Sequence, residues 1–236
     1  MIARFEELDW QQTPMGELTL RRRTDAETGE SIFEVKLRDE YLMSSLFTVA
    51  EEALSTLGLA AAHGDELSVL VGGLGLGYTA VTALDDERVT RLDIVDALPA
   101  VIGWHERELL PVSQRLVRDP RTRLVLGDFF AIMRGMPSAS TPPYDVILLD
   151  VDHSPRHTLD ASHADLYTTA GLHALRRHLA DDGVFALWSD DPPDDEFVET
   201  LAGVFPEPQA HVVDFANRLT GGTSSNTVYV ATAARS

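Results

Sequence analysis

The sequence contains no cysteine among its 236 residues. This excludes disulfide bonds, thiolate metal sites and cysteine nucleophiles from its chemistry. Long apolar runs are also missing, because stretches such as Leu67–Val71 and Val146–Leu149 are far too short to span a bilayer. The first residues, MIARFEELDWQQ, lack the basic and apolar segments of a secretion signal. We therefore expect a cytoplasmic protein that makes no contact with a membrane.

Positive charge is scarce. Lysine and arginine together number 19 against 38 acidic residues, which gives a net charge of −19, and Lys36 is the only lysine. Such a chain repels nucleic-acid backbones, so we expect no nucleic-acid partner. The acidity either attracts a cationic substrate or only keeps the protein soluble. The length, together with 44% apolar residues, suits one well-buried α/β core.

Two kinds of pattern follow one another along the chain. Residues 17–43 contain two strand-like runs around a polar stretch with a glycine, which predicts a β-hairpin. From residue 47 onward, helical and strand-like runs alternate. The expected helices cover 47–62, 78–86, 99–111, 129–136, 164–180 and 195–205, and the expected strands cover 67–73, 89–96, 123–128, 144–150, 183–189, 210–215 and 226–233.

This alternation predicts an α/β protein with a doubly wound, mostly parallel, seven-stranded sheet. We expect a small N-terminal β-hairpin domain over residues 1–45 and a catalytic domain over 46–236. Right-handed crossovers bring the carboxyl ends of the parallel strands to one rim, where ligands bind.

A glycine-rich turn directly follows the first expected strand of this sheet. It contains Gly72, Gly73, Gly75 and Gly77. Glycines here let the backbone turn sharply and approach a ligand closely, and the next helix points its N-terminus at the same place. By itself the turn indicates a nucleotide-type ligand.

Carboxylates end the next two strands. Asp96 lies 19 residues after Gly77, where it suits the ribose hydroxyls or the cap of the helix that starts at Pro99. Asp128 lies where an adenine amino group would donate to it, with Phe129 against the purine face, although it also suits a helix N-cap. Asp128 favours an S-adenosyl ligand over NAD.

Polar residues cluster after the fourth strand of the main sheet. Asp150, Asp152 and His153 follow a buried apolar run directly. A carboxylate there is suited to accept a hydrogen bond from an incoming amine and to orient it. A loop-capping cluster is the structural alternative. A metal site with His157 is a further one, but the glycine turn accounts for the site without a metal.

Together, VLVGGLGLGY, DIVDALPAVI, VLGDF and YDVILLDVDHSP resemble the polyamine aminopropyltransferases, the spermidine synthase family. The resemblance covers residues from about 10 to the end. It implies a Rossmann-like methyltransferase fold and a donor that is S-adenosylmethionine or its decarboxylated form, without a metal. It further implies that Asp96 holds the ribose, Asp128 the adenine amine, and that Asp150 is the catalytic carboxylate. Family members are commonly dimers or tetramers, so we expect a homodimer.

The acceptor half of the resemblance is less specific. Gly75 replaces a family aspartate, Leu42 a glutamine, Leu172 a tyrosine and Trp188 another glutamine, while Glu51 and Glu52 stand near a tyrosine-histidine pair. His153 replaces the second aspartate of a D-x-x-D signature, and Asp152 lies one position earlier. From these positions we select Asp152, His153, Glu52 and Trp188 as candidate substrate contacts.

Transfer of an aminopropyl group to an amine is the function that the resemblance implies. A methyltransferase on the same scaffold is the first alternative, because the lost polar anchors make the pocket more apolar. A non-catalytic nucleotide-binding protein is the second alternative. A dehydrogenase comes last, since Asp128 and the hairpin have no role in one.

Overall fold

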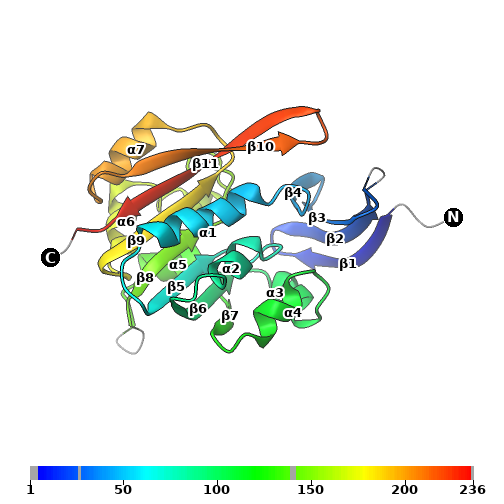
Figure 1. Ribbon diagram of the computed structural model, residues 1–236, viewed down its shortest axis with the longest axis horizontal. Helices are drawn as coiled ribbons and strands as arrows, with labels where there is room; N and C mark the ends of the chain where they lie inside the picture. Colours follow the sequence, from blue (N-terminus) through cyan, green and yellow to red (C-terminus); the bar gives the residue numbers. More distant parts are fainter. Residues whose placement is uncertain (1–4, 26–27, 139–141, 235–236) are drawn as a thin grey trace.

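The computed structural model describes residues 5–25, 28–138 and 142–234. Its strands form two sheets, of four and of seven strands. Figure 1 shows the smaller, N-terminal sheet at one end of the larger one, on the side away from the C-terminus.

The N-terminal sheet is antiparallel, in the order β1-β2-β3-β4. Its strands are β1 (Phe5–Thr13), β2 (Gly16–Thr24), β3 (Ser31–Leu37) and β4 (Glu40–Ser44). The predicted hairpin is the central β2–β3 pair, in which Leu18 lies opposite Leu37. The prediction missed β1 as a strand because its side chains are mostly polar, and it assigned no strand to β4. The division into domains at residue 45 stays a prediction.

The main sheet has the order β10-β11-β9-β8-β5-β6-β7, which confirms the predicted doubly wound sheet of seven strands. Its first five strands in the chain pair in parallel, and β11 and β10 are antiparallel. The strands are β5 (Leu67–Gly72), β6 (Val89–Asp96), β7 (Thr122–Leu126), β8 (Tyr144–Leu149), β9 (Leu179–Ser189), β10 (Gln209–Asn217) and β11 (Gly222–Thr232). Strand order reverses between β5 and β8, where ligands of such sheets bind.

Helices cover both faces of this sheet. They are α1 (Val49–Ala61), α2 (Tyr78–Ala83), α3 (Pro99–Glu106), α4 (Ser113–Arg118), α5 (Phe129–Arg134), α6 (Thr169–Arg176) and α7 (Asp195–Ala202), with a 3-10 turn at Ala161–His163. Side chains of α1 to α4 share one apolar core with Val71 and Leu148, and those of α5 to α7 share a second with Leu70 and Ile147. Because neighbouring strand residues point to opposite faces, the two cores lie on either side of the sheet. None of the helices within the described ranges is long and apolar enough to cross a membrane.

The helix expected over 164–180 is much shorter than predicted. Thr168 begins α6, because its hydroxyl accepts a hydrogen bond from Gly171 N at 3.1 Å. After the helix, the Arg176 guanidinium donates to the carbonyl oxygens of Leu179 and Ala180, and β9 begins at Leu179. The Asp-Asp-Gly that we expected to close the helix therefore lies within β9. Helix α4 was not predicted.

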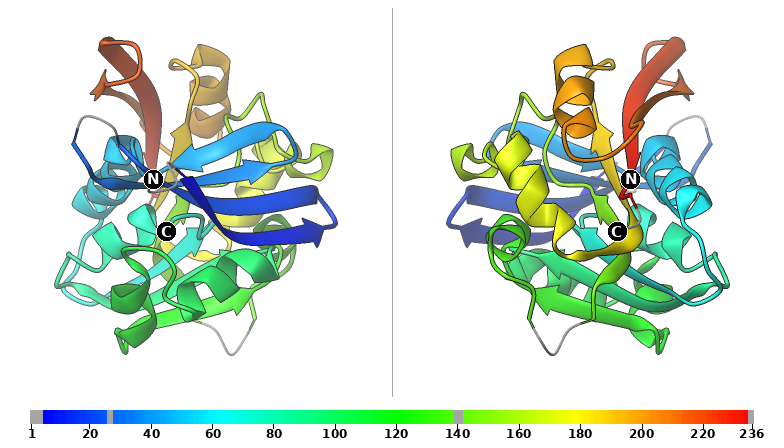
Figure 2. Two further views of the ribbon diagram at one scale, coloured as in Figure 1. Left: turned by 90° about the vertical axis from the view of Figure 1, so that its right-hand side faces the viewer. Right: turned by 90° about the vertical axis from the view of Figure 1, so that its left-hand side faces the viewer.

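The N-terminal sheet packs against the rim formed by the carboxyl ends of the parallel strands. Trp104 Nε1 in α3 donates to Asp9 Oδ2 in β1 at 2.6 Å, and Met43 in β4 lies against Gly75. Leu18, Phe33 and other side chains of the small sheet belong to the same core as α1 to α4. Figure 2 shows the small sheet alongside this rim, with the β10–β11 hairpin projecting next to it. The rim is thus enclosed on several sides.

Candidate active site

The glycine turn after β5 has the backbone that its sequence predicts. Gly73, Gly75 and Gly77 all have positive φ, of +94°, +47° and +89°. A Cβ on Gly73 would lie 2.0 Å from the Asp150 carbonyl oxygen, so the turn and the end of β8 are in direct backbone contact. A Cβ on Gly72 would lie 2.6 Å from the Phe129 ring. These glycines therefore allow close approach between protein segments as well as to a ligand.

Asp96 connects β6 to the glycine turn. Its Oδ2 accepts a hydrogen bond from Leu74 N at 3.0 Å, and its Oδ1 accepts one from Leu98 N at 2.8 Å. Burial raises the pKa of Asp96, while the hydrogen bonds from the backbone oppose that shift. The carboxylate thus ties the glycine turn to Leu98, the residue just before α3, although it is not the side-chain cap of that helix. Its contact with a ribose stays a prediction.

Asp128 and Phe129 follow β7. Asp128 is the N-cap of α5, because its Oδ1 accepts from Ala131 N at 3.0 Å. Its Oδ2 lies 3.8 Å from Arg134 Nη2. Phe129 is buried, and its ring packs on Gly72. The capping alternative for Asp128 is therefore correct, but it leaves one carboxylate oxygen for a ligand.

A cavity of about 310 Å³ joins these residues. We call it the glycine-loop cavity. It is lined by Gly73, Gly75, Asp96, Asp128, Phe129 and Asp150, with apolar side chains from the N-terminal sheet. Its size and mixed lining are typical of small-molecule sites. The predicted glycine turn and strand-end carboxylates are thus brought together around one space, although Gly72 lies behind Phe129 and not in its lining.

Asp150 lies immediately after β8. Its Oδ2 accepts a hydrogen bond from the Thr79 hydroxyl at 2.5 Å, and its backbone N donates to Gly72 O at 2.8 Å. Burial raises the pKa of Asp150 to about 6, and the Thr79 hydrogen bond offsets part of that shift. A carboxylate in this state is suited to proton transfer near neutral pH.

A second cavity, of about 270 Å³, shares Asp150 with the first. We call it the α1 cavity. Its walls include the predicted residues His153 and Trp188, together with Gly77, Glu51 and Tyr78. Asp150, Gly75 and Leu42 line both cavities. Asp150 is therefore where a ligand in one cavity would meet a ligand in the other.

Two nitrogens in the α1 cavity wall are buried and make no hydrogen bond within the described residues. They are Trp188 Nε1 and His153 Nε2. The carboxylate nearest to His153 Nε2 is that of Glu40, at 3.6 Å. The third notable group is Glu51, whose pKa is raised to about 8, mainly by burial and then by the charge of Asp150. Sequence reasoning noted Glu51 but did not select it.

Two residues predicted to contact substrate lie elsewhere. Asp152 is 1% exposed, and it accepts hydrogen bonds from Leu159 N, His163 Nδ1 and the Tyr167 hydroxyl. Glu52 is exposed and accepts from the Thr48 hydroxyl at 2.7 Å. Neither side chain lines either cavity, so this geometry does not support their predicted contacts with a substrate.

Several cavity residues carried no sequence signal. His163, held by Asp152, stacks on Phe130 with ring centroids 3.7 Å apart, and both rings line the glycine-loop cavity. Phe47 and Phe215 pair across the α1 cavity at 5.6 Å. They come from opposite ends of the chain, so only the tertiary fold brings them together. Leu172, aligned with a family tyrosine, is fully buried in the second core instead.

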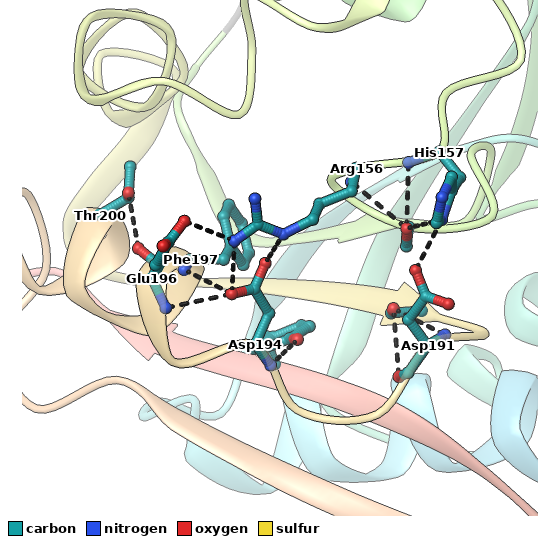
Figure 3. A network of polar contacts seen from close by, with 10 residues as sticks. Arg156, His157, Asp191, Asp194, Glu196, Phe197 and Thr200 are labelled. Atoms are coloured by element: carbon teal, nitrogen blue, oxygen red, sulfur yellow. Dashed lines mark hydrogen bonds and ion pairs between the residues drawn. The ribbon is translucent and has the colours of Figure 1, made fainter.

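The segments that follow β8 and β9 are tied together beside the α1 cavity. Figure 3 shows Arg156 donating to both oxygens of Asp194, at 2.5 and 2.9 Å, and also to Glu196. His157 Nδ1 contacts Asp191 Oδ2 at 2.8 Å in the same view. Asp190 N also donates to His153 O at 2.7 Å. This network fixes the two segments that carry His153 and Asp190.

The metal alternative required Asp150, Asp152, His153 and His157 to converge. Within the part of the chain that the structure describes, no three acidic or histidine side chains gather closely enough to hold an ion. His157 points to Asp191, and Asp152 points to Tyr167 and His163.

Comparison with known proteins supports the resemblance seen in the sequence. No protein-family model matches the chain. It is 33% identical over 126 residues to polyamine aminopropyltransferase 2 of Streptomyces coelicolor, covering 52% of this chain and 22% of that protein. It is 31% identical over 156 residues to the polyamine aminopropyltransferase of Pyrobaculum calidifontis, covering 66% of this chain and 53% of that protein. The chain thus spans about half or less of the length of these relatives.

Solved structures show the same fold. Spermidine synthase from Thermotoga maritima superposes with a TM-score of 0.71 at 18% identity, over 96% of this chain and 72% of that one. A spermidine synthase in complex with the transition-state analogue AdoDATO gives a TM-score of 0.72, also at 18% identity and with the same coverage. Human methyltransferase-like protein 13 in complex with SAH gives 0.54 at 21% identity, over 79% of this chain and 80% of that one. The fold is therefore that of spermidine synthases and related methyltransferases.

Proposed function

We propose that this protein is a transferase that moves an aminopropyl group from decarboxylated S-adenosylmethionine to an amine. The observation that carries the proposal is the position of Asp150 in the lining of both cavities. The glycine-loop cavity would hold the donor nucleoside, and the α1 cavity would hold the acceptor. The names of the relatives and of the structural neighbours agree with this reaction.

In this scheme the donor's ribose lies at Asp96 and its adenine amine at Oδ2 of Asp128, the oxygen that does not cap α5. An acceptor ammonium loses a proton to Asp150, and the nitrogen lone pair then attacks the propyl carbon next to the sulfonium. The carbon–sulfur bond breaks, and its electron pair stays on sulfur. Methylthioadenosine therefore leaves as a neutral thioether, and the product is a secondary ammonium that carries the positive charge formerly on sulfur. Asp150 acts as the base and orients the nucleophile.

The charge of the two cavities favours the decarboxylated donor over intact S-adenosylmethionine. Among their described lining residues there is no lysine or arginine, whereas Asp96, Asp128, Asp150 and Glu51 all contribute carboxyl groups. A donor that kept its own carboxylate would lie among like charges. A donor whose chain ends in an ammonium would be attracted by the same groups.

The product nucleoside decides between this function and methyl transfer. Purified protein is incubated with each donor and a panel of amines, and the released nucleoside is identified by mass spectrometry. We expect methylthioadenosine from the decarboxylated donor, and we expect Asp150→Asn to abolish its release. S-adenosylhomocysteine from the intact donor would favour the methyltransferase alternative. Binding of donor without any product would favour a non-catalytic nucleotide-binding protein.

We also propose that the chain forms a homodimer through its N-terminal sheet. Strand β1 is an edge strand of that sheet, and its Phe5 and Trp10 are 63% and 49% exposed. An unpaired edge with exposed aromatic side chains is suited to pairing with a second copy. Light scattering coupled to size-exclusion chromatography tests this, and a monomer at micromolar concentration would contradict it.

The cytoplasmic location and the lack of nucleic-acid and membrane partners stay predictions.

A further inference from the structure

Glu51 is an acidic side chain in the first turn of α1, and it lines the α1 cavity together with Asp150. Helix α1 packs against α2, β8, β9, β10 and β11, so its first turn is held firmly at the strand ends. The residue four positions later, Ser55, is buried, and its hydroxyl donates to Thr79 O at 2.6 Å. Thr79 in turn donates its own hydroxyl to Asp150. The face of α1 that carries Glu51 is thus in contact with α2, whose Thr79 binds Asp150.

Asp150 alone cannot accept hydrogen bonds from all the N–H groups of an ammonium, because these groups point in different directions. A primary ammonium has three N–H donors, as a lysine side chain does. Oδ2 of Asp150 already accepts the Thr79 hydroxyl, which leaves Oδ1 as its free oxygen. A buried ammonium with unpaired N–H groups would bind poorly. The cavity therefore needs a second acceptor close to Asp150, and Glu51 is the side chain that the fold provides.

We propose that Glu51 and Asp150 together form a two-carboxylate site for the acceptor's primary ammonium, and that Glu51 is a second substrate-contacting residue of this enzyme. This inference rests on the proposed aminopropyl transfer. After the proton passes to Asp150, the neutral amine keeps two N–H donors. Because Oδ1 of Asp150 then carries that proton, Glu51 is the carboxylate that accepts an N–H hydrogen bond. This bond holds the neutral amine while its lone pair attacks the donor. Glu51 thus contributes to the direction of attack as well as to binding.

The walls of the α1 cavity suit the hydrocarbon part of such an amine. Phe47, Phe215 and Trp188 supply aromatic surface around the cavity. Aromatic walls together with carboxylates match an amine carried on an aliphatic or aromatic chain. The substrate class that follows is a primary alkylamine or arylalkylamine that is cationic when free in solution.

Proximity of two carboxylates has a consequence for proton uptake. Burial and the charge of Asp150 raise the pKa of Glu51 to about 8, so at neutral pH the empty site holds a proton on the pair. An ammonium would displace that proton, since its own charge stabilises both carboxylates. The other titratable groups lining this cavity are Tyr41 from β4, Tyr78 from α2, His153 and Asp190, while β10 and β11 contribute the non-titrating Phe215 and Asn226.

The test is the pH dependence of KM for a primary amine, measured with saturating decarboxylated donor between pH 6 and 9. In the wild type, KM should fall as pH rises through about 8, because Glu51 becomes ionised. Glu51→Gln keeps an acceptor oxygen but no charge, so we expect KM to be raised about 10- to 100-fold at the alkaline end and to lose this pH dependence. Glu51→Asp should restore part of it.

Two further variants and one binding measurement make the result specific. Glu199→Gln removes an exposed charge from α7, far from both cavities, and should leave KM unchanged. Glu52→Gln removes the same charge one residue along α1, and an effect as large as that of Glu51→Gln would overturn the proposal. Affinity for methylthioadenosine within about twofold of wild type shows that Glu51→Gln is folded. If Glu51→Gln does not fold, the pH dependence of KM in Glu51→Asp decides. A pH dependence equal to that of the wild type would then count against the proposal.

Failure of this inference is distinguishable from failure of the proposed function. If the wild type converts amines and Glu51→Gln has the same KM and pH profile, only the role of Glu51 is wrong. If the wild type converts no amine with either donor, aminopropyl transfer is wrong, and the role of Glu51 falls with it.

Discussion

Replacing Gly73 by alanine should disrupt both the fold and the reaction, because its Cβ would enter space occupied by the backbone at the end of β8. The added atom would lie 2.0 Å from the Asp150 carbonyl oxygen and 2.9 Å from its carbonyl carbon. Backbone cannot rotate away as a side chain can, so the turn and Asp150 must separate by roughly 1.4 Å or more to reach ordinary contact distances.

Gly64→Ala supplies the matched control. Gly64 has a similar φ, +104° against +94° for Gly73, but nothing lies within 4 Å of its Cβ position. Its substitution therefore measures the backbone strain alone, which is about 1 to 3 kcal/mol. Gly73→Ala adds an overpacking cost of about 1 to 3 kcal/mol. The free energy of unfolding should thus fall further in Gly73→Ala by about the size of that second cost.

Urea unfolding of the two variants and the wild type measures this difference as a shift in midpoint at constant slope. The functional consequence is larger, because displacement of a catalytic group by about 1 Å can reduce the rate about 100-fold. We expect that loss in kcat for Gly73→Ala and an unchanged kcat for Gly64→Ala. Equal destabilisation by the two substitutions would refute the contact between the glycine turn and Asp150, and with it the structural link between donor site and base.

Three further predictions test individual carboxylates. Asp150→Asn should reduce kcat at least about 100-fold, and the wild-type rate should fall as pH drops through about 6, the raised pKa of Asp150. Because burial lifts this pKa above its value in the unfolded chain, the ionised group weakens the fold at pH 7.5. The variant should therefore melt at a higher temperature than the wild type. Asp128→Ala should lose donor affinity and about 1 kcal/mol of stability from the N-cap, whereas Asp128→Ser should lose only affinity. Calorimetry with methylthioadenosine measures the affinity. Equal stability of the two variants would contradict the capping role. Asp152→Asn should lower the free energy of unfolding in urea by about 1 to 3 kcal/mol, because it disturbs the hydrogen bonds from His163 and Tyr167. KM for the amine should change little. A large rise in KM would support the substrate contact predicted from the sequence.

The sequence was sufficient to predict those parts of the site that depend on the course of the backbone. Strands that alternate with helices, and acids that follow those strands, predicted the rim on which Asp96, Asp128 and Asp150 meet. The topology alone brings them together, since the carboxyl ends of parallel strands share one edge. No knowledge of side-chain direction was needed for this part.

Where function depends on side-chain direction, the sequence was less informative. Asp150 and Asp152 are two residues apart and would share a face in a strand, but β8 ends at Leu149 and the chain then turns. Asp152 is directed to His163, which comes from the 3-10 turn at Ala161–His163. No local pattern announces this partner, because the turn of the chain after β8 is set by tertiary contacts.

Helical periodicity would have separated Glu51 from Glu52. Residues three and four positions apart share one face of a helix. Glu51 therefore shares a face with Leu54 and Ser55, which are both buried in α1. Glu52 shares one with Ser55 and with Thr56, which is exposed. Alignment of the family's tyrosine-histidine pair with this region could not distinguish the two acids, but the spacing of apolar residues along the helix contained the answer.

The buried carboxyl groups of the two cavities favour the cationic substrates of the proposed reaction over its neutral thioether product. Burial raises the pKa of Asp96, Asp150 and Glu51, so their ionised forms destabilise the empty protein and are relieved by a cationic ligand. Both substrates of the proposed reaction are cations at the reacting atoms, one a sulfonium and the other an ammonium. Transfer removes the positive charge from sulfur, so the nucleoside product loses the attraction that held the donor. In the proposed reaction, the buried carboxylates that attract the cationic donor would therefore also favour release of the thioether once the carbon–sulfur bond has broken.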